Sequence, residues 1–103
     1  MDITGPVIVG DNSAIGPWVR ITGPVVIGDG CAIGEGSDIE DSVVWRDVRL
    51  GSQVKLKSSA VADNCTLDDG SLIKGGVLGD HVTVSAGARL EPGSMIEPGE
   101  TVG

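Results

Sequence analysis

The chain has 103 residues with 7 Lys or Arg and 15 Asp or Glu, so its formal net charge is −8. This length allows a single domain, and the negative charge disfavours binding to nucleic acid or to an anionic membrane surface. Hydrophobic residues make up 40% of the chain, but only 2% are aromatic and 17 residues are Gly, so Ile, Val, Leu and small side chains must fill the core.

Large aliphatic residues recur along the chain at a nearly constant spacing. Fourteen of the seventeen steps between them are six residues long, and the other three, Ile39 to Val44, Leu56 to Val61 and Leu67 to Leu72, are five residues long. In chain order, the aliphatic positions are Ile3, Val9, Ile15, Ile21, Ile27, Ile33, Ile39, Val44, Leu50, Leu56, Val61, Leu67, Leu72, Leu78, Val84, Leu90, Ile96 and Val102. A period of six fits neither a helix nor a plain strand. It indicates strands of two or three residues, each followed by a corner.

A second position supports the same repeat. The residue four after each aliphatic residue is small or β-branched in every unit until Glu100. These residues are Val7, Ser13, Val19, Val25, Cys31, Ser37, Val43, Val48, Val54, Ala60, Cys65, Ser71, Gly76, Val82, Ala88 and Ser94. Because both positions keep their register along the chain, a Gly-rich low-complexity segment is disfavoured.

The spacing predicts how the units are arranged. Three units close a triangular coil of about 18 residues, and successive coils stack at about 4.8 Å, the spacing between strands of a sheet. The aliphatic residues are expected to stack inside the triangle, with the small residues at its corners. The short steps after Ile39 and Leu56 then fall on the same side of adjacent coils.

The repeat resembles that of hexapeptide-repeat proteins. Two consecutive segments, Ile27-Gly28-Asp29-Gly30-Cys31-Ala32 and Ile33-Gly34-Glu35-Gly36-Ser37-Asp38, match the pattern [LIV]-G-x-x-[STAV]-x of that family. The resemblance implies an all-β fold, a single-stranded left-handed parallel β-helix of nearly six triangular coils. We expect one such domain over residues 1–103.

A narrower resemblance is to the C-terminal β-helix of nucleotide-sugar pyrophosphorylases, especially mannose-1-phosphate guanylyltransferase-like proteins. The segments that carry it are residues 23–30, 41–51 and 87–99. In those enzymes an N-terminal α/β domain performs the catalysis, and nothing in this sequence resembles that domain or its Gly-rich nucleotide loop. The resemblance therefore implies a non-catalytic scaffold domain that is part of, or associates with, a sugar-1-phosphate nucleotidyltransferase.

His81 is the only histidine and the only candidate for a catalytic base. Acyltransferases among hexapeptide-repeat proteins use a histidine to activate the acceptor. The resemblance thus offers a second reading, a minimal trimeric acyltransferase with acyl-CoA between its subunits. Against it, His81 follows Asp80 at an expected outward corner, and no step of the repeat is long enough for the loop that such enzymes extrude.

No metal or cofactor is expected. Related carbonic anhydrases use three His ligands for zinc, and this chain has one His. Cys31 and Cys65 occupy inward positions on one side, two coils apart with Val48 between them, a separation of about 9–10 Å that rules out a disulfide. Two reduced, buried thiols are therefore predicted.

The two tryptophans, Trp18 and Trp45, are expected to point outward. Exposed Trp is enriched in protein interfaces, although each could instead pack against a corner of its own coil. Arg46 and Arg49 flank Trp45, and a second basic pair lies one coil later (Lys55 and Lys57). These residues form the candidate interface, for which a solvated strand face is the simpler alternative.

The predicted function is a non-catalytic assembly domain that forms a homo-oligomer. A third reading is a structural β-helix that stacks end to end, because the repeat has no capping element and only Glu100 places a charge at an inward position. There is no apolar run of the roughly 18 residues that a membrane span needs, and no charged n-region of a signal peptide. The cytoplasm is the expected compartment.

Overall fold

The structure, a computed structural model, describes residues 2–103. These residues form eighteen strands of two or three residues each and no helix. Accordingly, the described part of the chain has no helix that could span a membrane. The expectation of very short strands separated by corners is confirmed.

The strands form three parallel sheets of six strands each, which we call sheets A, B and C. Sheet A consists of β1 (Asp2–Thr4), β4 (Arg20–Thr22), β7 (Asp38–Glu40), β10 (Lys55–Lys57), β13 (Leu72–Lys74) and β16 (Arg89–Leu90). Sheet B consists of β2 (Val7–Val9), β5 (Val25–Ile27), β8 (Val43–Val44), β11 (Ala60–Val61), β14 (Val77–Leu78) and β17 (Met95–Ile96). Sheet C consists of β3 (Ala14–Ile15), β6 (Ala32–Ile33), β9 (Arg49–Leu50), β12 (Thr66–Leu67), β15 (Thr83–Val84) and β18 (Thr101–Val102).

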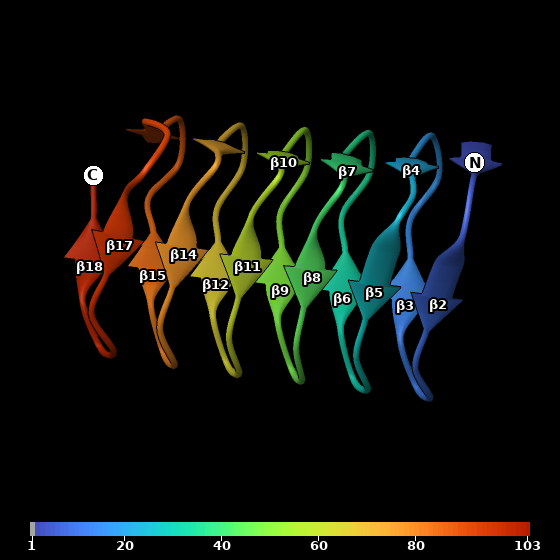
Figure 1. Ribbon diagram of the computed structural model, residues 1–103, viewed down its shortest axis with the longest axis horizontal. Helices are drawn as coiled ribbons and strands as arrows, with labels where there is room; N and C mark the ends of the chain where they lie inside the picture. The colour runs from blue at the N-terminus through green and yellow to red at the C-terminus, as the bar shows by residue number, and fades with distance from the viewer. Residues whose placement is uncertain (1) are drawn as a thin grey trace.

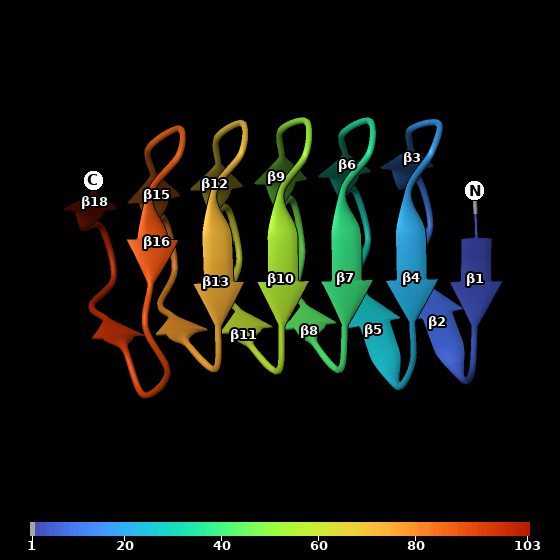
Figure 2. The same cartoon turned by 90° about the horizontal axis from the view of Figure 1, so that it is seen from above.

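Each coil contributes one strand to each sheet, so the chain rises through a stack of six coils. Figure 1 shows the coils side by side, with the N-terminal end at the right and the C-terminal end at the left. In Figure 2 the strands of sheet A face the viewer in one row, from β1 to β16. The predicted arrangement of triangular coils in three sheets is confirmed.

The core lies inside the triangle, and the large aliphatic residues follow the predicted inward positions with one exception. Ile73 pairs with Leu56 and Leu90 and is fully buried, whereas the predicted inward residue, Leu72, is only half-buried and pairs with Lys55 and Arg89. The prediction for Leu72 was wrong because both residues of the doublet are aliphatic, and spacing alone does not separate them.

This correction makes the repeat more regular. The third five-residue step runs from Ile73 to Leu78, so all three short steps connect sheet A to sheet B in consecutive coils. The three shortened corners stack on one another, and the strands of sheets A and B stay in register with the longer coils on either side.

The short corners also move the small inward position by one residue. Val43 and Ala60 were predicted to point inward, but Val43 is 37% exposed and Ala60 is half-buried. The buried residues at these corners are Ser42 and Ser59, three residues after the aliphatic residue rather than four. The Ser42 Oγ accepts a hydrogen bond from the backbone N–H of Ser59 (3.2 Å), which links the two coils.

The corner between sheets B and C requires a left-handed backbone in every coil. The residues with positive φ there are Asn12, Gly30, Asp47, Asn64, His81 and Gly99. Gly, Asn and Asp tolerate this conformation best. From the second coil on, each of these corners also donates a hydrogen bond to the coil before it, as from Gly30 N to the Asp11 carbonyl (2.9 Å).

Burial is greatest in the middle coils. Ile3 and Val9, in the first coil, are 48% and 40% exposed although they occupy inward positions. Glu100 in the last coil occupies the corner position of Val82, and its side chain is exposed rather than enclosed. Its carbonyl accepts a hydrogen bond from Thr83 N (3.0 Å).

Candidate protein-binding face

The three sheets present different chemistry to the outside. On sheet A, the outward row that pairs across the coils is largely charged: Asp2, Arg20, Asp38, Lys55, Leu72 and Arg89. On sheet C, the corresponding row is small or polar apart from one Arg: Ala14, Ala32, Arg49, Thr66, Thr83 and Thr101. On sheet B, it is apolar in all six coils: Ile8, Val26, Val43, Ala60, Val77 and Met95. We call this last row the aliphatic stripe.

The aliphatic stripe is open to solvent except at Ala60, which is half-buried. Ile8 is 66% exposed, Val77 47% and Met95 78%, and Val26 and Val43 are near 40%. Single exposed aliphatic residues are ordinary, but a contiguous apolar row on one face marks a contact surface. The outer face of sheet B is therefore the candidate contact surface of the molecule.

A row of carboxylates borders the stripe where sheet B turns into sheet C. Its members, which we call the acidic edge, are Asp11, Asp29, Asp63, Asp80 and Glu97. Three of them also link successive coils: an Oδ1 atom accepts a backbone N–H from the preceding coil at Asp29 (2.8 Å), Asp63 (2.9 Å) and Asp80 (3.1 Å). The acidic edge thus has a structural role, and its second carboxylate oxygens add negative charge beside the stripe.

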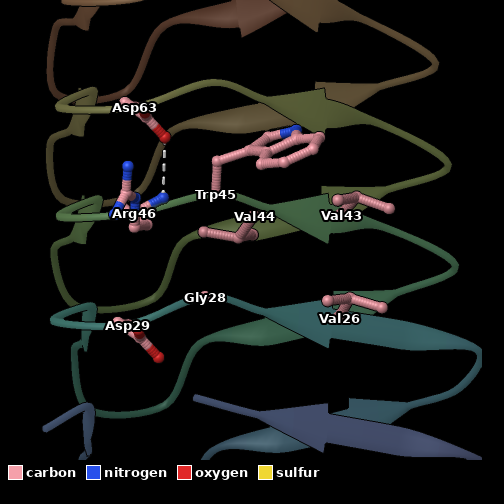
Figure 3. A pocket seen from close by; sticks show the side chains of 8 residues that line it. All are labelled: Val26, Gly28, Asp29, Val43, Val44, Trp45, Arg46 and Asp63. Atoms are coloured by element: carbon pink, nitrogen blue, oxygen red, sulfur yellow. Dashed lines mark hydrogen bonds between the residues drawn. The ribbon is translucent and has the colours of Figure 1, made fainter. Parts of the chain in front are cut away.

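Trp45 and Arg46 interrupt the acidic edge at its middle coil. Trp45 is 57% exposed, and Figure 3 shows its indole directed along sheet B toward the following coil. Beside it lies a groove of about 470 Å³, whose apolar lining includes Val26, Val43 and Trp45 and whose polar end holds Asp29, Arg46 and Asp63. Gly28 is needed in this lining, since a Cβ there would lie 2.6 Å from the Trp45 carbonyl oxygen.

The remaining candidate residues lie on other parts of the surface. Arg49 is on β9 in sheet C, so the predicted cluster around Trp45 retains only Arg46. Trp18 is 76% exposed at the corner between sheets C and A, where its φ of 62° is a conformation that Gly36, Gly70 and Gly87 adopt in other coils. The outward orientation of both tryptophans is confirmed, and their role in an interface stays a prediction.

His81 lies at the left-handed corner of the fifth coil, exposed and with φ of 59°. Its backbone N–H donates to the Asp63 carbonyl (3.0 Å), the bond that other coils make at the same corner. The imidazole is not part of the groove beside Trp45. In other coils Asn12, Gly30, Asn64 and Gly99 have a positive φ at this corner. A catalytic role for His81 stays a prediction.

Cys31 and Cys65 are buried and free, as predicted. Burial raises the pKa of both thiols. Each Sγ also donates to a carbonyl of the next coil, from Cys31 to Trp45 (2.9 Å) and from Cys65 to Gly79 (3.0 Å). Among residues 2–103, no group of three or more His, Cys, Asp or Glu side chains is placed to hold a metal ion.

The stripe itself escaped the sequence analysis although its pattern is visible there. Every third unit carries an apolar doublet, such as Val26-Ile27 or Val77-Leu78, whereas the other units place a polar, charged or small residue before most inward aliphatics. The first residue of each doublet forms the stripe.

The model of the EIF2B subunit epsilon LbH domain, where LbH denotes the left-handed β-helix, matches residues 10–103. The chain belongs to this family. Membership of the EIF2B epsilon LbH family confirms the predicted left-handed, hexapeptide-repeat β-helix. Among curated proteins, no sequence match was found.

Solved structures share the fold of this EIF2B epsilon LbH family member. The acetyltransferase domain of PglB from Neisseria gonorrhoeae superposes with a TM-score of 0.76 at 18% identity, covering 97% of this chain and 49% of the other. A candidate acetyltransferase from Bacillus cereus superposes with a TM-score of 0.69 at 21% identity, covering 93% of this chain and 73% of the other. The chain thus spans about half the length of the Neisseria domain, and at these identities the fold is what is shared.

Proposed function

We propose that this chain is a non-catalytic assembly module that binds protein through the outer face of sheet B. The observation that carries the proposal is the aliphatic stripe, which runs through all six strands of that sheet while sheets A and C present mainly charged, polar and small residues. A rigid stack of coils with one apolar face suits a role in holding polypeptides together.

Two further points support an assembly role. The matching family takes its description from a domain of one subunit, EIF2B epsilon. The sequence also resembles the C-terminal β-helix of sugar-nucleotide pyrophosphorylases, in which catalysis belongs to a different domain. In that setting the module would position a nucleotidyltransferase domain rather than act on its substrate.

The experiment is a solution mass by light scattering over a wide concentration range, with two matched double variants. Val26→Glu/Val43→Glu adds two negative charges on the stripe, and Thr66→Glu/Thr83→Glu adds the same charge on sheet C. Self-association through sheet B predicts a discrete oligomer for the wild type and the sheet C variant, and a monomer for the stripe variant. A mass that grows without limit in all three proteins would indicate end-to-end stacking instead and would contradict the proposal.

The alternative function is acyl transfer. It is favoured by the acetyltransferase domain among the structures of this fold and by the exposure of His81. The test is calorimetric titration with acetyl-CoA, followed by turnover assays on His81→Asn, which preserves the left-handed corner because Asn12 and Asn64 occupy it in other coils. Binding, with turnover that this variant loses, would establish the enzyme and overturn the non-catalytic proposal.

A further inference from the structure

The two long borders of the aliphatic stripe differ in charge. The acidic edge places five carboxylates along one border, with Arg46 at the equivalent position of the third coil. The opposite border, where sheet A turns into sheet B, has two carboxylates, Asp41 and Glu91, and otherwise uncharged corner residues such as Pro6, Ser58 and Gly75. A molecule that lies along the aliphatic stripe therefore contacts apolar side chains beneath it and carboxylates of the acidic edge on one side.

We propose that this face binds a basic amphipathic helix of another protein, laid along the stack of coils. The apolar residues of the helix would rest on the aliphatic stripe, and Lys or Arg residues on one of its flanks would face the acidic edge. This inference rests on the proposed function and names the kind of partner that the face fits.

The spacing of the coils favours a helix over an extended segment. Stripe residues repeat at about 4.8 Å along the stack, while a helix presents its apolar side at intervals of about 5.4 Å. An extended strand places same-side residues roughly 6.7 Å apart and so loses register within two coils. The strands of sheet B are already paired with each other, so a partner strand finds no free backbone on this face.

The length of the stripe sets the length of the helix. Six coils span five steps of about 4.8 Å, or about 24 Å, which a helix of about 16 residues covers. This lies within the 29 Å long dimension of the molecule.

The charge of the chain favours a basic partner over a second copy. Two copies of a chain with a net charge of −8 repel each other, and antiparallel packing of two B faces would set one acidic edge against the other. A basic flank instead meets carboxylates at successive coils. Charge complementarity of this kind speeds association and selects partners, and it weakens with salt.

The groove beside Trp45 gives the helix an anchor point. Its apolar lining, Val26, Val43 and Trp45, has room for one large apolar side chain of the partner. Next to it, Arg46 replaces a carboxylate in the acidic edge, so the helix should carry an uncharged or acidic residue at this point. The groove thus fixes where along the stripe the helix binds.

The test uses two synthetic helical peptides of about 18 residues with the same Leu stripe. One carries Lys along one flank, and the other carries Glu at the same positions. By calorimetric titration at low salt, we expect the Lys peptide to bind at least about tenfold more tightly than the Glu peptide, with the difference shrinking as salt screens the charges. Amide shifts in NMR spectra should concentrate on the strands of sheet B.

Three variants locate the site. Val26→Glu/Val43→Glu should lower the affinity for the Lys peptide by at least about tenfold. The equally charged Thr66→Glu/Thr83→Glu should leave that affinity within about twofold of the wild-type value. A third variant replaces each acidic-edge residue by its amide, which keeps the oxygen that accepts the coil-linking hydrogen bond. It should bind the two peptides about equally.

The outcomes separate this inference from the proposed function. If the protein self-associates through the stripe and prefers neither peptide, the partner is a second copy and the inference is overturned, while the assembly role stands. If the protein is monomeric and binds neither peptide, both the inference and the proposed function are contradicted. Equal weakening by the sheet B and sheet C variants would also overturn the inference, because binding would then not involve the stripe.

Discussion

Two buried serines at equivalent corners show how a single hydroxyl affects this fold. Ser37 and Ser71 are both fully buried. The Ser37 Oγ donates to the Gly51 carbonyl (2.9 Å) and accepts the Val54 N–H (3.2 Å), whereas the Ser71 Oγ has no hydrogen-bond partner in the described part of the chain. A buried hydroxyl without a partner costs about 1–3 kcal/mol.

Replacing each of these serines by Ala should therefore change the free energy of unfolding in opposite directions. Ser71→Ala should raise the free energy of unfolding by about 1 kcal/mol, and Ser37→Ala should lower it by about 1–2 kcal/mol because a donor and an acceptor are lost. Urea denaturation of the two variants measures both values. Equal destabilisation would show that the Ser71 hydroxyl does have a partner.

The two buried thiols should make the stability of the fold depend on pH. Because burial raises the pKa of Cys31 and Cys65 in the folded chain, each thiol favours folding while it is protonated in both states. This contribution is complete below the unfolded thiol pKa of about 8.5 and is lost as pH rises through the higher folded value. The stability of the wild type relative to Cys31→Ala/Cys65→Ala should therefore fall as pH rises above the unfolded thiol pKa.

Urea denaturation of both proteins at several pH values measures this difference. As an independent readout, both thiols should react slowly with a thiol reagent near neutral pH until the protein is unfolded. A stability difference that stays constant with pH, or rapid labelling of the folded chain, would contradict the burial of these groups.

At the scale of the strands, the corrected core position is open to a direct test. Ile73 is fully buried between Leu56 and Leu90, so Ile73→Ala should cost about 2–5 kcal/mol of stability. Leu72 lies in the outward row of sheet A, and Leu72→Ala should cost less than about 1 kcal/mol. Thermal or urea denaturation decides between the two residues, and a larger loss for Leu72→Ala would restore the register first predicted.

The elements show why the repeat was predictable and one strand was not. A period of six and a small residue in each unit determine the coil and the number of strands, because every coil must close the same triangle. Spacing leaves the register of β13 open, since Leu72 and Ile73 are both aliphatic. Only the stacking of that strand on β10 and β16 selects Ile73.

The same limit applies to the candidate interface. Trp45 and Arg46 were predicted together and do lie together, because adjacent residues at one corner stay close in any coil. Arg49 lies only four residues further on, but it belongs to a different sheet. In a triangular coil a few residues of sequence separation change the face of the molecule, so clusters along the sequence are poor guides to clusters in space.

At the scale of the whole molecule, one backbone repeat supports three unlike surfaces. The inward positions are nearly uniform, whereas the outward positions differ by side: mostly charged on sheet A, aliphatic on sheet B, small and polar on sheet C. The net charge of −8 is likewise uneven, since five carboxylates gather along one corner. The faces can therefore carry different partners without disturbing the core they share.

The regular stacking of the coils has a consequence for length. Each coil touches only its neighbours, and a cut from Val44 to Ala60 would remove one 17-residue turn while keeping every sheet continuous. Losing or duplicating such a turn would shorten or extend the rod by about 4.8 Å without changing the order of residues around it. The number of coils therefore sets the length of the rod, and with it the length of the surface that each sheet offers to a partner.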